Sequence, residues 1–220
     1  MKLYHEDCIK VLQSMPDESV DLVVTDPPYK VITGGRNNGK NLKRPVGILS
    51  KNNGFFVNIP KISEWMAEIY RILKNQTHCY IFTNTINMKE MLIEAENAGF
   101  KLHNILVWEK NNCTPSQYYM KNCEYILFLR KGEAKYIHNI GDSKTVHQFN
   151  NIIGNKLHPT EKPVDLLKFY IKNSSNVGDT VLDPFMGVGS TGVACKELNR
   201  DFIGCEIDDG YFEIAERRLT

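Results

Sequence analysis

The tetrapeptide Asp26-Pro27-Pro28-Tyr29 carries acceptor groups and an aromatic ring that could bind an exocyclic amine. It ends the apolar run Asp21–Asp26, which is typical of a buried strand, and its two prolines make a rigid, non-helical corner. The prolines remove two N–H donors but keep their carbonyls, so Asp26 and the Pro27 carbonyl can face a ligand that brings only donors. Tyr29 adds a flat face on which a base can stack. The alternative is an ordinary turn at a strand end.

A second motif, Gly187-Val-Gly-Ser-Thr-Gly192, is a G-x-G-x-x-G turn that follows the apolar run Asp179–Phe185 and opens a predicted helix. Glu206 ends the next predicted strand about 20 residues later, where such folds place a carboxylate for ribose hydroxyls. The glycines allow a nucleotide-like ligand to approach the backbone closely. The alternative is a tight turn that needs glycine only for packing.

The position of this glycine turn disfavours a dinucleotide site and a nicotinamide-dependent enzyme. All but one of the other predicted strands precede the turn, which makes it a mononucleotide-binding half placed last in the chain. The sequence contains no second half of this kind, and the turn offers a pyrophosphate nothing beyond the helix N-terminus.

The composition is that of an ordinary globular chain of 220 residues, 42% hydrophobic and 24% charged. The formal net charge is +1, so any affinity for a polyanion must come from local patches. No apolar run approaches the roughly 18 residues that span a bilayer, and the first residues lack a signal peptide, so we expect a cytoplasmic protein without a membrane partner. The six scattered cysteines form no CxxC pair, which predicts reduced thiols and no metal site.

Apolar runs and helical periodicities alternate along most of the chain, which predicts an α/β domain with a mainly parallel sheet. The expected strands are Lys2–Glu6, Asp21–Asp26, His78–Asn84, Asn104–Glu109, Cys123–Arg130, Asp179–Phe185 and Asp201–Asp208. The expected helices are 62–73, Met88–Ala98, Pro163–Lys172 and Tyr211–Leu219, and a further helix begins at the glycine turn. Two segments follow neither pattern, Lys30–Lys61 and Lys131–Leu157.

Three motifs together closely resemble those of the DNA amino-methyltransferases. They are the tetrapeptide, the block His158-Pro-Thr-Glu-Lys-Pro163, and the run Leu182-Asp-Pro-Phe-Met-Gly-Val-Gly-Ser-Thr191. Their order, with the tetrapeptide first and the glycine turn last, matches the β group of this family, a circular permutation of the methyltransferase fold. The resemblance spans nearly the whole chain. It implies a single catalytic domain with a Rossmann-like, seven-stranded mixed sheet, S-adenosylmethionine as cofactor, and methylation of adenine N6 or cytosine N4.

The resemblance also implies roles for individual residues. The catalytic positions are Asp26, Pro27, Pro28 and Tyr29. The cofactor-binding positions are Asp7, Cys8, Thr160, Lys162, Pro163, Asp183, Phe185, Gly187, Gly189, Ser190, Thr191 and Glu206. Among these, Glu206 matches the acid that holds the ribose hydroxyls, and the block around Lys162 matches one that closes over the methionine moiety. The alternative for Lys162 is a solvated cation at a helix start.

DNA is the macromolecular partner that the resemblance implies. The stretch Lys30–Lys61 holds seven Lys or Arg and no Asp or Glu, and we expect a mobile loop that contacts phosphates, with a solvated insertion as the alternative. In the resembling group, target recognition lies between the last sheet strand and the His158 block, which is here the short segment Lys131–Leu157. So little recognition surface disfavours long target sites and, because many relatives pair, predicts a homodimer.

The first residue of the tetrapeptide bears on the choice of base. In the resembling group Asp is associated chiefly with adenine and Ser with cytosine N4, so Asp26 predicts N6-methyladenine, with N4-methylcytosine as the alternative. Methylation of an RNA base or a protein glutamine is less favoured, because such enzymes often carry an Asn-initiated tetrapeptide and place the glycine turn before it. The remaining alternative is a catalytically idle DNA-binding module, which the intact tetrapeptide disfavours.

Overall fold

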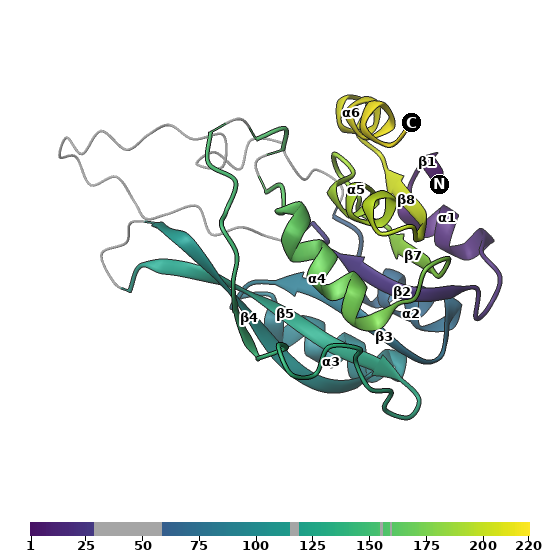
Figure 1. Cartoon of the computed structure of the whole chain (residues 1–220). Coiled ribbons are helices and arrows are strands. Elements are labelled where there is room, and N and C mark those ends of the chain that lie inside the picture. The colour runs from purple at the N-terminus through teal and green to yellow at the C-terminus, as the bar shows by residue number, and fades with distance from the viewer. Residues whose placement is uncertain (29–58, 115–118, 155, 159) are drawn as a thin grey trace, which may run out of the picture.

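One mixed sheet runs through the protein, with strand order β1-β8-β7-β2-β3-β5-β4-β6 in the computed structural model (Figure 1). The structure describes residues 1–28, 59–114, 119–154, 156–158 and 160–220. The strands are β1 Lys2–His5, β2 Val20–Thr25, β3 Leu73–Thr83, β4 Lys101–Thr114, β5 Lys121–Lys131, β6 Val146–Gln148, β7 Thr180–Asp183 and β8 Asp201–Glu206. Within these residues the sheet has eight strands, so the expected number of seven was wrong.

The eighth strand is β6, which pairs with the middle of β4, at Val107–Glu109. It is only three residues long and lies in the segment Lys131–Leu157, which the sequence predicted to be irregular. Three residues are too few for an alternation of apolar and polar side chains to be recognised. The strand is therefore defined by its pairing with β4.

Strand directions bring several chain segments to one edge of the sheet. Strands β1, β8, β7, β2 and β3 are parallel, and their carboxyl ends therefore share an edge. Strand β5 is antiparallel to β3, with Thr83 paired with Tyr125, so the beginning of β5 reaches the same edge. Strand β4 is antiparallel to β5 in turn and ends there. In open α/β sheets, ligands bind outside these carboxyl ends.

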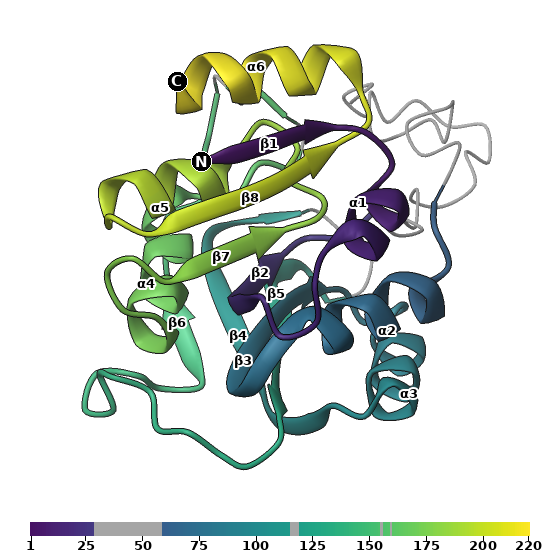
Figure 2. The ribbon, with the colours of Figure 1, turned by 90° about the vertical axis from the view of Figure 1, so that its right-hand side faces the viewer.

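Helices cover both faces of the sheet (Figure 2). Their bounds are α1 Cys8–Ser14, α2 Ile62–Ile72, α3 Met88–Ala98, α4 Val164–Ser174, α5 Ser190–Glu197 and α6 Asp209–Leu219. One buried cluster joins α1, α2 and α3 to the sheet through Leu12, Trp65, Ile69 and Met91. A second cluster joins α4, α5 and α6 through Leu167, Tyr170, Ala194 and Leu219. Because apolar side chains are buried on both faces, the strands read as nearly continuous apolar runs in the sequence.

The sequence signals of helices α3 and α1 explain why the first was predicted with its observed bounds and the second was not predicted. Helix α3 has the predicted bounds, because its periodicity is regular and Gly99 ends it in the left-handed conformation, with φ 104°. Helix α1 was not predicted, since seven residues hold too little periodicity. No helix among the described residues is long and apolar enough to cross a membrane.

Candidate active site

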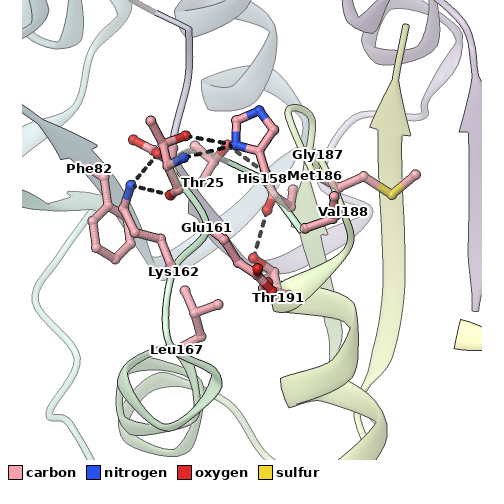
Figure 3. A pocket seen from close by; sticks show the side chains of 14 residues that line it. Thr25, Phe82, His158, Glu161, Lys162, Leu167, Met186, Gly187, Val188 and Thr191 are labelled. Atoms are coloured by element: carbon pink, nitrogen blue, oxygen red, sulfur yellow. Dashed lines mark hydrogen bonds and ion pairs between the residues drawn. The ribbon is translucent and has the colours of Figure 1, made fainter. Parts of the chain in front are cut away.

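An open pocket of about 410 Å³ lies at the edge formed by the carboxyl ends of β2 and β7 (Figure 3). Five segments line it: the end of β2, β3, the His158 block with the start of α4, the end of β7, and the glycine turn with the start of α5. The lining residues are Thr25, Asp26, Phe82, His158, Thr160, Glu161, Lys162, Leu167, Asp183, Met186, Gly187, Val188, Ser190 and Thr191. The pocket thus joins the tetrapeptide to the other two motifs, which follow it in the sequence by more than a hundred residues.

Asp26 and Lys162 form an ion pair at the centre of this arrangement. The Lys162 ammonium also lies 3.3 Å from Glu124 Oε2, donates to the Thr160 carbonyl at 3.2 Å, and stands 5.2 Å from the centre of the Phe82 ring. Burial lowers the pKa of Lys162, but the two carboxylates raise it more, and the net shift is upward. Lys162 is therefore a buried, paired cation, and the alternative of a solvated cation at a helix start was wrong.

The glycine turn from Phe185 to Ser190 is shaped by backbone conformations that favour glycine. Gly187 has φ 52°, and a side chain built there would meet nothing within 4 Å, so its backbone is open to the surroundings. Gly192 differs, because a Cβ there would lie 2.6 Å from Leu219 and 2.8 Å from Phe202. Gly192, the third glycine of the motif, is therefore required for packing. Gly187, the first, leaves space for a ligand to approach the backbone.

Asp183 ties the glycine turn to its neighbours. Its carboxylate accepts hydrogen bonds from the Thr25 and Thr191 hydroxyls, both at 2.7 Å, and from the Phe185 N–H at 3.1 Å. Burial raises the pKa of Asp183 to about 6 against these hydrogen bonds. Asp183 lines the pocket, but three partners within the protein already engage its oxygens, so it holds β2, β7 and α5 together.

Glu206 lies beside the turn, at the end of β8. Its carboxylate accepts from the Gly187 N–H at 3.0 Å and from the N–H groups of Ile207 and Asp208 at 2.9 and 2.8 Å. Burial raises the pKa of Glu206, and the three N–H groups oppose that rise. These bonds fix the carboxylate against the turn. Three of the about four acceptor positions of its two oxygens are taken, and because Glu206 is only partly buried, unlike Asp183, one position remains open to a ligand hydroxyl.

Asp7 and Cys8 stand at the start of α1, next to the end of β8. Asp7 caps that helix, because its carboxylate accepts the Ile9 N–H at 2.8 Å. Cys8 is buried against Val11 and Cys205, and burial raises the pKa of its thiol to about 12, so it is uncharged at neutral pH. Both residues have structural duties here, and neither lines the pocket.

The predicted site residues thus divide into three groups. Those that line the pocket are Asp26, Thr160, Lys162, Asp183, Gly187, Ser190 and Thr191. Those placed around it are Asp7, Cys8, Pro27, Pro28, Pro163, Phe185, Gly189 and Glu206, with Pro163 capping α4 and Gly189 capping α5. Tyr29 and residues 30–58 of the predicted DNA-contacting loop lie outside the described residues.

Glu161 is a site residue that the prediction missed. Its carboxylate accepts from the Leu157 N–H at 2.9 Å, from Arg218 at 3.1 Å and from the Ser190 hydroxyl at 3.3 Å. Arg218 in turn donates to the Val188 carbonyl at 2.8 Å. Glu161 therefore fastens the His158 block to the glycine turn. The available signal was its position, because Glu161 lies inside the His158 block, several other members of which were assigned to the site. Glutamate is rarely buried without a partner, and here it is 9% exposed.

His158 has its ring next to this network. Its Nδ1 accepts the Thr160 N–H at 3.2 Å and lies 3.0 Å from the Thr160 hydroxyl, and the ring packs edge-on against Tyr211. Burial and, less strongly, the Lys162 charge lower the pKa of His158 to about 4. His158 is neutral at pH 7 and acts as an acceptor that shapes the block. No cluster of His, Cys, Asp or Glu suited to a metal occurs in the part of the chain that the structure describes.

Comparisons with known proteins agree with this arrangement of motifs. The family model "DNA methylase" matches residues 20–217. The chain is 32% identical to the Type II methyltransferase M2.DpnII of Streptococcus pneumoniae over 239 residues, which covers 100% of this chain and 89% of the relative. It is 28% identical to the M1.HpyAVI–SAM complex, with a TM-score of 0.75 and coverage of 100% and 99% of the two chains.

A third comparison extends the likeness of fold. The PvuII DNA methyltransferase, described as cytosine-N4-specific, shares 20% identity and a TM-score of 0.75, with coverage of 99% of this chain and 86% of that one. The Rossmann-like α/β fold that the motifs predicted is therefore confirmed, and so is the predicted family. The chain belongs to the DNA methylase family, whose members transfer a methyl group from S-adenosylmethionine to DNA.

Proposed function

We propose that this enzyme methylates the exocyclic N6 amine of adenine in DNA. The observation that carries the proposal is the placement of Asp26: its carboxylate lines the same pocket as the glycine turn, at the carboxyl edge of the sheet. An amine acceptor and a cofactor turn that share one pocket are what methyl transfer to an amine requires, because the reacting atoms must meet in line.

The glycine turn and its surroundings suit S-adenosylmethionine. The open backbone at Gly187 gives a ligand room to approach, and Glu206 holds that backbone while keeping acceptor capacity for ribose hydroxyls. Thr160 and Ser190 offer further hydroxyl groups on the pocket wall. When bound, this cofactor supplies an electrophilic methyl group on a sulfonium.

The tetrapeptide supplies the acceptors for the target amine. An amino group on a base is a poor nucleophile because its lone pair is delocalised into the ring, and a base inside a duplex must first be extruded, at a cost of a few kcal/mol. We propose that the two N–H groups of the target amine donate hydrogen bonds to the Asp26 carboxylate and to the Pro27 carbonyl. These bonds draw the amine toward tetrahedral geometry. A paired cation such as Lys162 favours the charged form of a carboxylate, which is the form that accepts these bonds. Asp26 need not be a strong base, because the amine proton becomes acidic only as the new bond forms.

Adenine is preferred because Asp occupies the first position of the tetrapeptide, the residue that the resembling group associates chiefly with adenine N6. Incubating unmethylated DNA with the protein and S-adenosylmethionine, followed by mass spectrometry of the nucleosides, tests this choice. We expect N6-methyladenine. N4-methylcytosine alone would show that Asp26 does not set the base, and no methylated base would contradict the DNA methyltransferase activity itself.

Two partner predictions stay predictions. Contact of residues 30–61 and Lys131–Leu157 with DNA would be tested by footprinting the bound chain. The predicted homodimer would be tested by light scattering of the free protein and of its DNA complex, where a monomer in both states would contradict it.

A further inference from the structure

Four charged side chains of alternating sign run from the predicted amine acceptor into the sheet. They are Asp26 after β2, Lys162 before α4, Glu124 on β5 and Lys110 on β4. Lys162 contacts both Asp26 and, at 3.3 Å, Glu124, and the second oxygen of Glu124 contacts Lys110. Each carboxylate therefore meets Lys162, and Glu124 has a second cation of its own.

Burial makes this row sensitive to the loss of any one charge. Lys162 is 6% exposed, and the side chains of Asp26, Glu124 and Lys110 are 19%, 23% and 18% exposed. A buried ammonium that loses its carboxylates keeps the cost of its desolvation without the ion pairs that offset it. Lys162 will therefore stay against at least one carboxylate at every stage of the reaction.

This requirement bears on the task assigned to Asp26. Lys162 donates to Asp26 Oδ2, so the ammonium takes up part of the acceptor capacity that the target amine needs and restricts how the carboxylate can turn toward it. Glu124 is the second carboxylate within reach of the same ammonium. We propose, on the basis of the function proposed above, that Glu124 is a positioning residue that holds Lys162 and thereby leaves Asp26 able to accept the amine.

Glu124 acts through Lys162 in this account, and that distinguishes it from a residue that only joins β5 to β4 through its ion pair with Lys110. If it only joined the two strands, its loss would add to the loss of Lys162. If it acts through the Lys162 ammonium, its loss should matter only while that ammonium is present. A double-mutant cycle separates these two cases.

The test measures single-turnover methyl transfer to DNA at saturating cofactor for the full chain and the variants Glu124→Gln, Lys162→Met and the double variant. We expect Glu124→Gln to slow transfer about tenfold, while the half-saturating concentrations of cofactor and of DNA, read from separate titrations of the rate, change less than about twofold, because the substitution replaces no predicted binding residue. In the Lys162→Met background, Glu124→Gln should change the rate less than about twofold. The matched control is Glu96→Gln, which neutralises an exposed carboxylate on α3, on the opposite face of the sheet from α4.

A second variant decides the question if Glu124→Gln does not fold, which thermal unfolding would show. Lys110→Met removes the competing cation from Glu124 and leaves that carboxylate to Lys162 alone. We expect transfer to become faster, whereas a structural role for the row predicts slower transfer.

The outcomes that overturn the proposal are specific. A rate for Glu124→Gln equal to that of the unmodified chain, additive losses in the cycle, or slower transfer by Lys110→Met would each contradict it. These failures differ from failure of the proposed function, in which the unmodified chain itself would transfer no methyl group to DNA.

Discussion

The two halves of the pocket hold their carboxylates by different means. In the half built around the glycine turn, Asp183 on the pocket wall and Glu206 beside the turn accept hydrogen bonds from hydroxyls and backbone N–H groups, most of them close in sequence. In the other half, Asp26 is paired with the ammonium of Lys162, 136 residues away. Neutral donors and a paired cation both favour the charged form of a carboxylate, but only the cation brings a second charge into the pocket. The difference suits a cofactor half whose carboxylates keep the same hydrogen bonds throughout the reaction. In the acceptor half, Asp26 must also accept the target amine.

The largest effect that would test this division is expected from Asp26→Asn. The change keeps the size of the side chain but removes the charge that Lys162 pairs with, and we expect transfer to fall about 10³-fold or more, within the range for lost transition-state stabilisation. Cofactor affinity should stay within about threefold, because Asp26 meets the base. Tritium transfer and isothermal titration measure the two quantities.

A matched control for that variant is Asp21→Asn. Asp21 lies on the same strand, but at its other end, where it pairs with Lys74. Transfer by Asp21→Asn near that of the unmodified chain would show that losing a carboxylate on β2 is not itself the cause.

The second effect belongs to the cofactor half. Glu206→Gln removes a charged acceptor beside the Gly187 N–H, and such hydrogen bonds contribute roughly 1.5–3 kcal/mol. We expect cofactor affinity to weaken by about tenfold or more, as read by isothermal titration. Asp209→Asn, on an exposed side chain three residues further along, should leave the affinity unchanged. Equal affinity for Glu206→Gln and the unmodified chain would return Glu206 to a structural role.

A smaller effect is expected where the two halves are joined. Glu161→Gln replaces the charged acceptor that Arg218 and the Leu157 N–H share, and we expect the free energy of unfolding to fall by about 1–2 kcal/mol. Urea unfolding measures that loss. If stability is unchanged, the network around Glu161 does not fasten the His158 block to the glycine turn.

An effect on stability of similar size depends on pH. His158 has a pKa of about 4 in the folded chain against 6.5 in the unfolded chain, so the unfolded state binds more protons between these values. The stability contributed by neutral His158 is present above pH 6.5 and is lost as the pH falls toward 4. We expect His158→Asn to lose less stability than the unmodified chain between pH 7 and 5, by up to about 2 kcal/mol in urea unfolding. Parallel losses in the two proteins would contradict that assignment.

Features that depend on neighbouring residues could be predicted from the sequence, and those that depend on distant ones could not. The bounds of α3 follow from local periodicity and Gly99, and the glycine turn with Glu206 follows from a spacing of 19 residues. Strand β6 has no local signal and forms against β4. No pattern within one segment shows which cation an aspartate will meet, and the pairing of Asp26 with Lys162 arises only when β2 and the His158 block fold together.

The contact of Glu124 with Lys162 could not be predicted from the sequence either. In sequence Glu124 is the second residue of the expected strand Cys123–Arg130 and is only a charge near a strand end. Only the antiparallel pairing of β5 with β3 and β4 brings it to the edge where the parallel strands end. Its contact with Lys162 is therefore a consequence of sheet topology.

The most direct test of the account measures cofactor affinity and single-turnover transfer side by side in Asp26→Asn and Glu206→Gln. The account predicts a crossed result: Asp26→Asn binds S-adenosylmethionine nearly as well as the unmodified chain but transfers almost nothing to adenine, while Glu206→Gln binds it at least about tenfold more weakly and still transfers at saturating cofactor. If Asp26→Asn lost cofactor affinity in proportion to its rate, or kept most of its rate, the division of the pocket into an acceptor half and a cofactor half would be wrong.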